Sequence, residues 1–141
     1  MRWEDVETEI PGLAARAKTF FDAHTHLTLA TLRKDGSPRI SGTEIIWRDG
    51  DLCIGSMRGG MKALDLHRDP RFALHSASED PPGWSGDAKV AGRAEELEHE
   101  EDFHLFRFDV TELVVLGLNA DRSRMVVESW HEGRGTERLE R

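Results

Sequence analysis

The sequence predicts a mainly β protein, an antiparallel barrel of short strands with small helices. Many short runs of β-favouring residues are separated by turn signals, and few segments carry helical spacing. The Asp49-Gly50 step between two apolar runs predicts a hairpin, which makes those strands antiparallel. A length of 141 residues suits one domain. We therefore expect a single domain over 1–141, with the barrel at about 27–131.

Two segments have the spacing of amphipathic helices. In the first, Leu13 and Phe21 belong to one apolar face, and Pro11 stands in the first turn, where its missing amide hydrogen is tolerated. We expect this helix at about 11–23. The second, at about 60–67, ends ahead of Asp69-Pro70, because proline disfavours helical geometry in the residue before it.

The remaining β-favouring runs predict the strands. They cover 27–33, 39–48, 51–57, 72–78, 88–97, 106–118 and 124–130. Residues 113–116 and Leu118 are apolar on both faces, whereas the outer face of an antiparallel barrel normally meets water. Something must cover this run. We expect a second copy of the chain, giving a homodimer, and the alternative is packing of the first helix.

Composition excludes several classes of protein. A formal net charge of -8 argues against nucleic acid as a partner, since nucleic-acid binders usually carry a basic face. The sequence has no apolar run long enough to span a membrane and no secretory signal pattern, so we expect no membrane association. Cys53 is the one cysteine, in an apolar run, which favours a buried thiol and a reducing, cytoplasmic setting.

The segment 55–62, with the sequence GSMRGGMK, is the strongest functional signal. It places two glycines and a lysine where a strand ends and a short helix begins. Free backbone amides, the positive end of a helix and the Lys62 ammonium together predict a site for a phosphate group. The segment also lies in the net positive part of the chain, since residues 33–71 hold eight basic and six acidic residues. The spacing is not that of a nucleotide-hydrolysing P-loop, because no Ser or Thr follows Lys62.

The sequence contains no clear catalytic or metal-binding motif. The serines lack a Gly-x-Ser-x-Gly elbow and no motif pairs Cys53 with a histidine, so catalytic residues stay unknown. His24 and His26 would point to one side of an extended segment, but no further histidine or cysteine at ligand spacing supports them. We therefore expect no metal site.

Several short motifs, taken in their order along the chain, resemble those of a known protein family. The motifs are LTLATL at 27–32, DGSPR at 35–39, GS at 55–56, KAL at 62–64, DPRFAL at 69–74 and VAGRAE at 90–95. Together, over about 11–130, they resemble the pyridoxamine 5'-phosphate oxidase-like FMN-binding split-barrel family. The resemblance implies a split β-barrel homodimer with FMN in a groove between the subunits. Some members of the family use the deazaflavin coenzyme F-420 instead.

The resemblance also implies cofactor-binding residues. Arg39 and Lys62 match positions near the cofactor phosphate, and Trp130 is similar to a tryptophan contributed by the partner subunit. Ring-edge and tail positions correspond to Ile40, Ser41, Gly42, Gly55, Ser56 and Met57. Met61 replaces an arginine of the family pattern, and Arg58 is the cation placed to compensate.

Two departures bear on function. Glu44 stands where the authentic oxidase has a lysine, and residues 134–138 lack the Arg-x-His pattern that grips the vitamin phosphate. Vitamin B6 is therefore not the expected substrate. We expect an FMN-dependent oxidoreductase acting on a small organic molecule, because a bound flavin supplies the redox chemistry. The alternatives are an F-420-dependent reductase and a non-catalytic carrier or sensor of flavin or haem.

Overall fold

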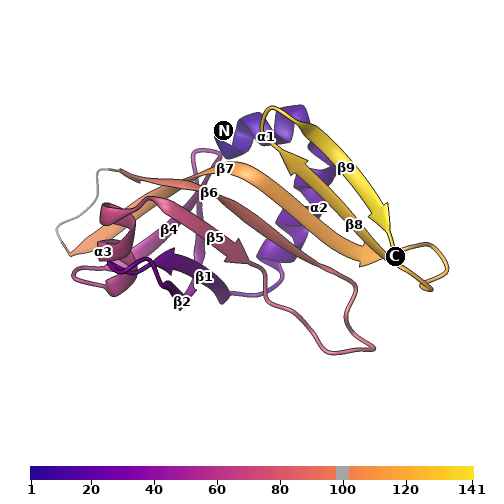
Figure 1. Ribbon diagram of the computed structural model, residues 1–141, viewed down its shortest axis with the longest axis horizontal. Coiled ribbons are helices and arrows are strands. Elements are labelled where there is room, and N and C mark those ends of the chain that lie inside the picture. Colours follow the sequence, from indigo (N-terminus) through magenta and orange to yellow (C-terminus); the bar gives the residue numbers. More distant parts are fainter. Residues whose placement is uncertain (98–101) are drawn as a thin grey trace.

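The computed structural model describes residues 1–97 and 102–141. Its strands form one nine-stranded sheet in which every neighbouring pair is antiparallel, curled into a split barrel (Figure 1). From β1 to β9 the strands are Leu27–Leu32, Pro38–Thr43, Ile45–Arg48, Asp51–Met57, Arg71–His75, Asp87–Leu97, Phe103–Leu118, Met125–His131 and Gly135–Glu140. The predicted fold class, mainly β with small helices, is confirmed.

Helices occupy two separate parts of the molecule (Figure 1). The described chain has α1 at Trp3–Glu9, α2 at Pro11–Asp22 and α3 at Met61–Arg68. The predictions at 11–23 and 60–67 correspond to α2 and α3, whereas α1 and the C-terminal strand β9 were not predicted. None of these helices has both the length and the apolar character needed to cross a bilayer.

Strand β7 joins the two halves of the sheet. Its first residues pair with β4, from Met57 opposite Phe103 to Cys53 opposite Arg107. Its last residues pair with β8 instead, while β6 runs along most of its other edge. The β6–β7 register shifts between Ala91 and Gly92. A Cβ at Gly92 would lie 1.9 Å from the Asp109 carbonyl oxygen, so this irregularity requires glycine.

The barrel closes at Glu44. The predicted strand at 39–48 is two strands: β2 ends at Thr43 and pairs with β1, and β3 begins at Ile45 and pairs with β4. In the strand order β2-β1-β5-β6-β7-β4-β3, β2 and β3 stand at the two ends. In the chain, Glu44 alone separates them. The sheet must therefore curl until its ends meet at this residue.

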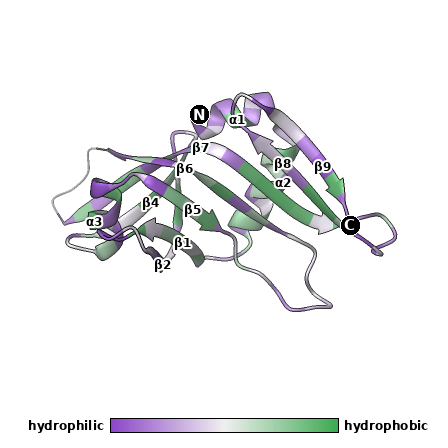
Figure 2. Ribbon diagram, viewed as in Figure 1, coloured by the Kyte–Doolittle hydropathy of each residue, from purple (hydrophilic) through white to green (hydrophobic). Residues whose placement is uncertain are grey.

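The apolar end of β7 is covered by the chain's own first helices. Hydrophobic residues follow this strand in Figure 2, and Leu113 and Val115 are 0% and 5% exposed within a single chain. Helix α2 packs against β6 and β7, and its Phe21 belongs to the same core. Helix α2 therefore covers the side of this run that carries Leu113 and Val115, whereas Leu116 and Leu118 stay partly exposed in the single chain. The homodimer stays a prediction.

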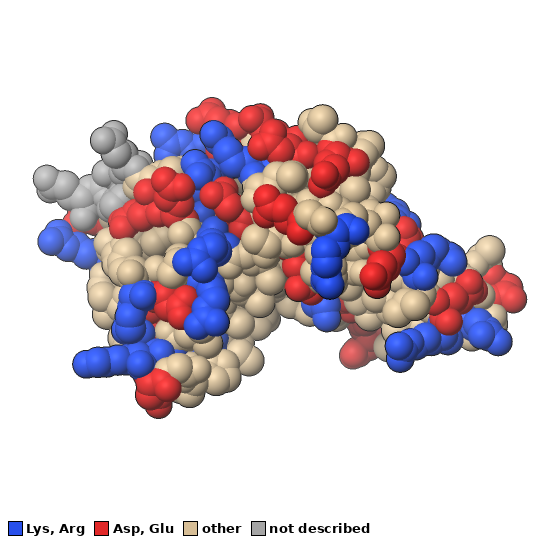
Figure 3. Space-filling view, turned by 45° about the horizontal axis from the view of Figure 1, so that its top comes forward, with Lys and Arg blue, Asp and Glu red and all other residues tan. Residues whose placement is uncertain are grey.

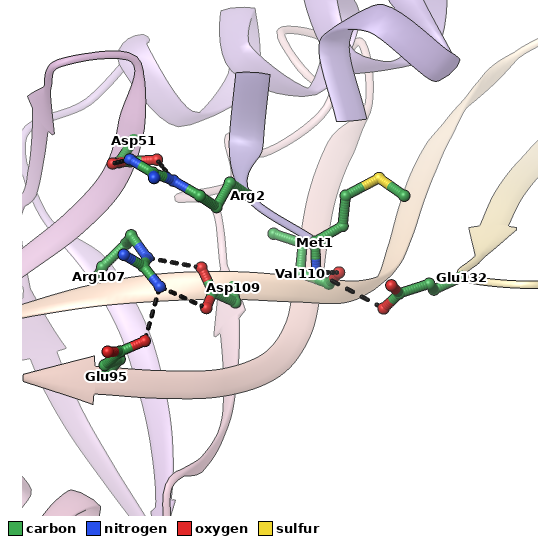
Figure 4. A network of polar contacts seen from close by, with 8 residues as sticks. All are labelled: Met1, Arg2, Asp51, Glu95, Arg107, Asp109, Val110 and Glu132. Carbon is green, nitrogen blue, oxygen red and sulfur yellow. Dashed lines mark hydrogen bonds and ion pairs between the residues drawn. The ribbon is translucent and has the colours of Figure 1, made fainter. Parts of the chain in front are cut away.

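Ion pairs hold the N-terminal segment against the barrel (Figure 4). The Arg2 Nε donates to Asp51 Oδ1 over 3.0 Å, and the Asp51 carboxylate is buried at the start of β4. On the neighbouring part of β7, Arg107 binds Asp109 over 2.8 Å and Glu95 over 2.7 Å. The Arg2–Asp51 pair anchors the start of α1 over the core, where Trp3 is 1% exposed.

Candidate functional site

One large pocket lies where β2, the end of β4 and the start of α3 meet. Its volume is about 590 Å³, within the range of pockets that hold small cofactors. The lining residues are His26, Arg33, Arg39, Ile40, Ser41, Gly42, Thr43, Glu44, Ile46, Gly55, Ser56, Met57, Gly60, Met61, Lys62 and Phe103. The pocket therefore lies beside the residue at which the barrel closes.

Lys62 brings a cation to the pocket from the first turn of α3. Its ammonium donates to the Gly42 carbonyl oxygen over 3.0 Å, which leaves further N–H groups for a ligand. Burial lowers the pKa of Lys62, and the nearby Glu44 carboxylate offsets this only in part. The pocket thus contains a partly desolvated positive charge, which interacts strongly with a bound anion.

Arg39 is the second cation, and a buried carboxylate holds it. Its Nε lies 2.8 Å from Asp65 Oδ2, and the Asp65 side chain is 0% exposed. Thr31 Oγ1 donates to the same oxygen over 2.8 Å, and Arg68 approaches the other oxygen at 3.4 Å. Burial would raise the pKa of Asp65, but the hydrogen bonds from Arg39 and Thr31 outweigh it and hold the pKa below its ordinary value. Arg39 is therefore fixed in place with most of its charge balanced.

The turn between β4 and α3 is tightly packed. Ser56 is 3% exposed and its hydroxyl donates to the Met57 carbonyl oxygen over 3.2 Å. A Cβ at Gly60 would lie 2.6 Å from Ser56 Oγ and 3.0 Å from the Met57 carbonyl oxygen. Gly60 is also the N-cap of α3, and no side chain caps the helix there. The first-turn amides of α3 are thus left without a side-chain cap at the edge of the pocket.

Exposed apolar side chains surround the same pocket. Ile40 is 74% exposed, Met57 79%, Met61 52% and Phe103 37%, and all four line it. The Phe103 ring lies over Gly55, where a Cβ would be 2.2 Å from the ring. Large exposed apolar groups gathered at one cavity mark a binding surface for a ligand or a protein.

Nine of the eleven sequence-predicted binding residues line this pocket. They are Arg39, Ile40, Ser41, Gly42, Gly55, Ser56, Met57, Met61 and Lys62. The structure does not bring Arg58 or Trp130 there. Arg58 is exposed on the turn, and its amide donates to the Asp102 carbonyl oxygen at 3.4 Å. Trp130 is 1% exposed in the core, opposite Leu113 on β7, and does not line the pocket of its own chain; its contact with a partner's cofactor stays a prediction.

Sequence reasoning missed several residues that shape the site. A charged residue such as Asp65 in a short helix is normally expected on the surface, yet Asp65 is buried and contacts Arg39. Arg33 lines the pocket from the residue after β1, and Phe103 lines it from β7, far along the chain; no local pattern marks either residue. His26, weighed with His24 as a metal ligand, lies 3.3 Å from Glu44, whereas His24 lies 3.2 Å from Glu79. The two histidines therefore have different carboxylate partners.

Surface charge on one side of the molecule is mixed. In Figure 3, Lys and Arg side chains alternate with Asp and Glu across the face in view. The cationic character of the pocket is thus a local property, set by Lys62, Arg39 and Arg33, within a chain of net charge -8.

The fold and the cation-lined pocket define a split-barrel protein of the pyridoxamine 5'-phosphate oxidase type. The family model described as pyridoxamine 5'-phosphate oxidase matches residues 13–127. The chain belongs to this family, as the sequence motifs predicted. A comparison with curated proteins found no match.

Solved structures share the fold at low sequence identity. PhzG from Burkholderia lata 383, in complex with tetrahydrophenazine-1-carboxylic acid, has a TM-score of 0.72 at 13% identity, covering 99% of this chain and 95% of that one. A pyridoxamine 5'-phosphate oxidase-related, FMN-binding protein from Nostoc punctiforme has a TM-score of 0.68 at 12% identity, covering 92% and 95%. A heme-binding protein from Mycobacterium smegmatis has a TM-score of 0.67 at 22% identity, covering 83% of this chain and 57% of that protein.

Proposed function

We propose that this protein binds FMN in the pocket between β2, β4 and α3 and acts as an oxidoreductase on a small organic substrate. One observation carries the proposal: a single pocket combines cations and the start of a helix with exposed apolar side chains. FMN has the same two parts, an anionic phosphate and a flat, largely apolar ring. The FMN-binding relative from Nostoc punctiforme supports the same choice.

The residues present fit the phosphate group. Lys62 offers N–H donors beyond its bond to Gly42, and the uncapped first-turn amides of α3 lie at the same edge. Gly60 keeps the turn before these amides tight, because a Cβ there would lie 2.6 Å from Ser56 Oγ. Arg39 and Arg33 add positive charge along the pocket wall. Lys62, Ser56 and the α3 amides would hold the phosphate.

Other residues of the same pocket fit the ring. Residues 40–42 of β2 present a strand edge with the exposed Ile40, and Met57 and Phe103 add apolar surface from β4 and β7. A bound flavin would supply hydride transfer, so the chain's task is to orient the ring, exclude water and leave room for a substrate. No residue is assigned an acid or base role.

The functional unit we propose is a homodimer. Ile40, Met57, Met61 and Phe103 leave an apolar rim exposed in the single chain, and a second subunit would cover it together with the ring. Sedimentation analysis should give twice the chain mass for wild type, and Ile40→Lys should shift the protein toward monomer. A wild-type protein that stays monomeric at all concentrations would contradict this part of the proposal.

Two alternatives have their own observations. Asp65 balances the charge of Arg39, and the Glu44 carboxylate partly offsets that of Lys62, so the pocket offers FMN phosphate less positive charge than its cations alone suggest, and F-420 stays an alternative. His26 lines the pocket and offers an imidazole to a haem iron, and one structural relative is a heme-binding protein. Either cofactor would occupy the same pocket.

Titration with FMN tests the proposal. Lys62→Ala should weaken FMN binding by about 1.5–3 kcal/mol, roughly 10- to 150-fold, the usual loss for a hydrogen bond to a charged group. Lys89→Ala is the matched control, because Lys89 is exposed on β6 outside the pocket. Equal affinity of wild type and Lys62→Ala would overturn the phosphate site. Binding of F-420 or haemin without FMN would select the corresponding alternative.

A further inference from the structure

Three metal-ligating side chains meet beyond the pocket, at the other end of α3. His67 lies in the last turn of α3, Glu96 near the end of β6 and His104 near the start of β7. His67 Nε2 is 2.5 Å from Glu96 Oε2, and His104 Nδ1 is 2.8 Å from Glu96 Oε1. The donor atoms of all three residues lie within 4.8 Å of one another.

The fold explains why these side chains converge. Glu96 stands opposite Phe106 in the β6–β7 ladder, and His104 is two residues before Phe106, so the three side chains share one face of the sheet. Helix α3 lies across this end of the sheet (Figure 1) and brings His67 to the same face. The His67 and His104 ring centroids are 5.2 Å apart, and the buried Phe106 ring lies 5.5 Å from that of His67.

The arrangement differs from the other histidine pairs of the described chain. His24 with Glu79 and His131 with Glu112 are contacts of one imidazole with one carboxylate. Glu96 instead directs each of its two oxygens to a different imidazole. The side chains of the three residues are 20–39% exposed, so an ion from solvent can reach them.

We propose that His67, Glu96 and His104 form a binding site for a divalent transition-metal ion of the Zn²⁺ class. Two imidazole nitrogens and one carboxylate are a set that zinc accepts at about 2.0–2.2 Å per bond, with a fourth position left for water. Imidazole ligands favour such ions over Mg²⁺ and Ca²⁺, which prefer all-oxygen sites. The ion replaces the present hydrogen bonds and joins α3 to the ends of β6 and β7.

This site is independent of the proposed cofactor pocket. None of its three residues is among those that line the pocket. The proposal departs from the sequence-based expectation of no metal site, which depended on spacing along the chain. His67, Glu96 and His104 are far apart in sequence and meet through the β6–β7 register and the position of α3.

Calorimetric titration of untagged protein with ZnCl₂ tests the proposal. Wild type should bind one ion per chain. Loss of even an outer-shell partner lowers metal affinity about 10- to 100-fold, so His67→Gln and His104→Gln should each weaken zinc binding by more than about 100-fold. His131→Gln is the matched control, since His131 is a half-buried histidine with a single carboxylate partner, and it should bind as wild type does.

The zinc-induced change in Tm provides a second readout, because it compares each variant with itself and so separates zinc binding from the basal stability of that variant. Saturating Zn²⁺ should raise the Tm of wild type and His131→Gln, because a ligand of the native state stabilises it, and should leave the Tm of His67→Gln unchanged. Wild type that takes up no zinc, or equal zinc affinity in wild type and both site variants, would overturn the proposal.

Discussion

Asp65 fixes Arg39 beside the cofactor pocket, with Arg39 Nε 2.8 Å from a carboxylate oxygen that is fully buried. The same helix carries Lys62 one turn earlier, where the ammonium bonds only to the Gly42 carbonyl oxygen among the contacts described. Helix α3 therefore supplies both the carboxylate that balances one cation and the cation that stays available. Lys62 is for this reason the residue on which the affinity for a phosphate should depend most.

Removal of Asp65 should destabilise the fold. Asp65→Ala leaves Arg39 and the Thr31 hydroxyl without their acceptor. Removing one partner of a buried ion pair lowers the free energy of unfolding by about 3 kcal/mol or more. Asp65→Asn keeps an oxygen acceptor and should cost less. Urea unfolding measures both. Glu79→Ala, which removes an exposed contact with His24, is the control and should change little, and a similar loss in Asp65→Ala and Glu79→Ala would argue against the role of Asp65.

Binding of FMN should weaken at alkaline pH. Burial holds the pKa of Lys62 below its ordinary value of 10.5, so the ammonium loses its proton earlier than an exposed lysine as pH rises. The attraction to a phosphate is present below this pKa and lost above it. Lys62→Arg stays cationic over this pH range, and any ionisation of FMN itself affects both proteins equally. The affinity of Lys62→Arg for FMN should therefore fall less than that of wild type. Parallel pH profiles for the two proteins would contradict the prediction.

Substitution of Glu44 should tighten FMN binding. Glu44 lines the pocket and interacts with Lys62, and it opposes an incoming phosphate. Its side chain is 60% exposed, so solvent screens the effect and Glu44→Gln should improve Kd only a few-fold, about 1 kcal/mol or less. The gain should shrink as salt concentration rises. A weaker affinity in Glu44→Gln at low salt would show that the carboxylate helps to hold the ligand.

Cys53 should be inert in the native protein. Its side chain is 0% exposed on β4, and burial, reinforced by the nearby Asp51 carboxylate, raises the pKa of the thiol to about 11. Little thiolate then exists at mildly alkaline pH. Iodoacetamide should leave native protein unlabelled and label it in denaturant, as mass spectrometry would show. Rapid labelling without denaturant would mean that β4 opens readily.

Local sequence patterns predicted most of the fold. The periodicity of α2, the Asp49-Gly50 hairpin and the glycine–lysine segment before α3 each depend on a few neighbouring residues, and the structure has the corresponding elements. Helix α1 was missed because it is short and acidic, and only Trp3 and Val6 mark its buried face. Strand β9 is exposed along its whole length and depends on pairing with β8, so no apolar alternation marks it.

The features that were wrong or missed depend on contacts between distant segments. The run 39–48 is uniformly β-favouring, and only closure of the barrel divides it at Glu44. Asp65 and the cluster of His67, Glu96 and His104 depend on where α3 packs, which sequence spacing does not encode.

The most direct test of the account is a crystal structure of the protein grown with FMN. The account predicts the phosphate within hydrogen-bonding distance of Lys62 Nζ and the first amides of α3, with the ring against residues 40–42 and a second subunit across the apolar rim. A phosphate bound elsewhere, or a pocket closed off from ligand and partner alike, would contradict it.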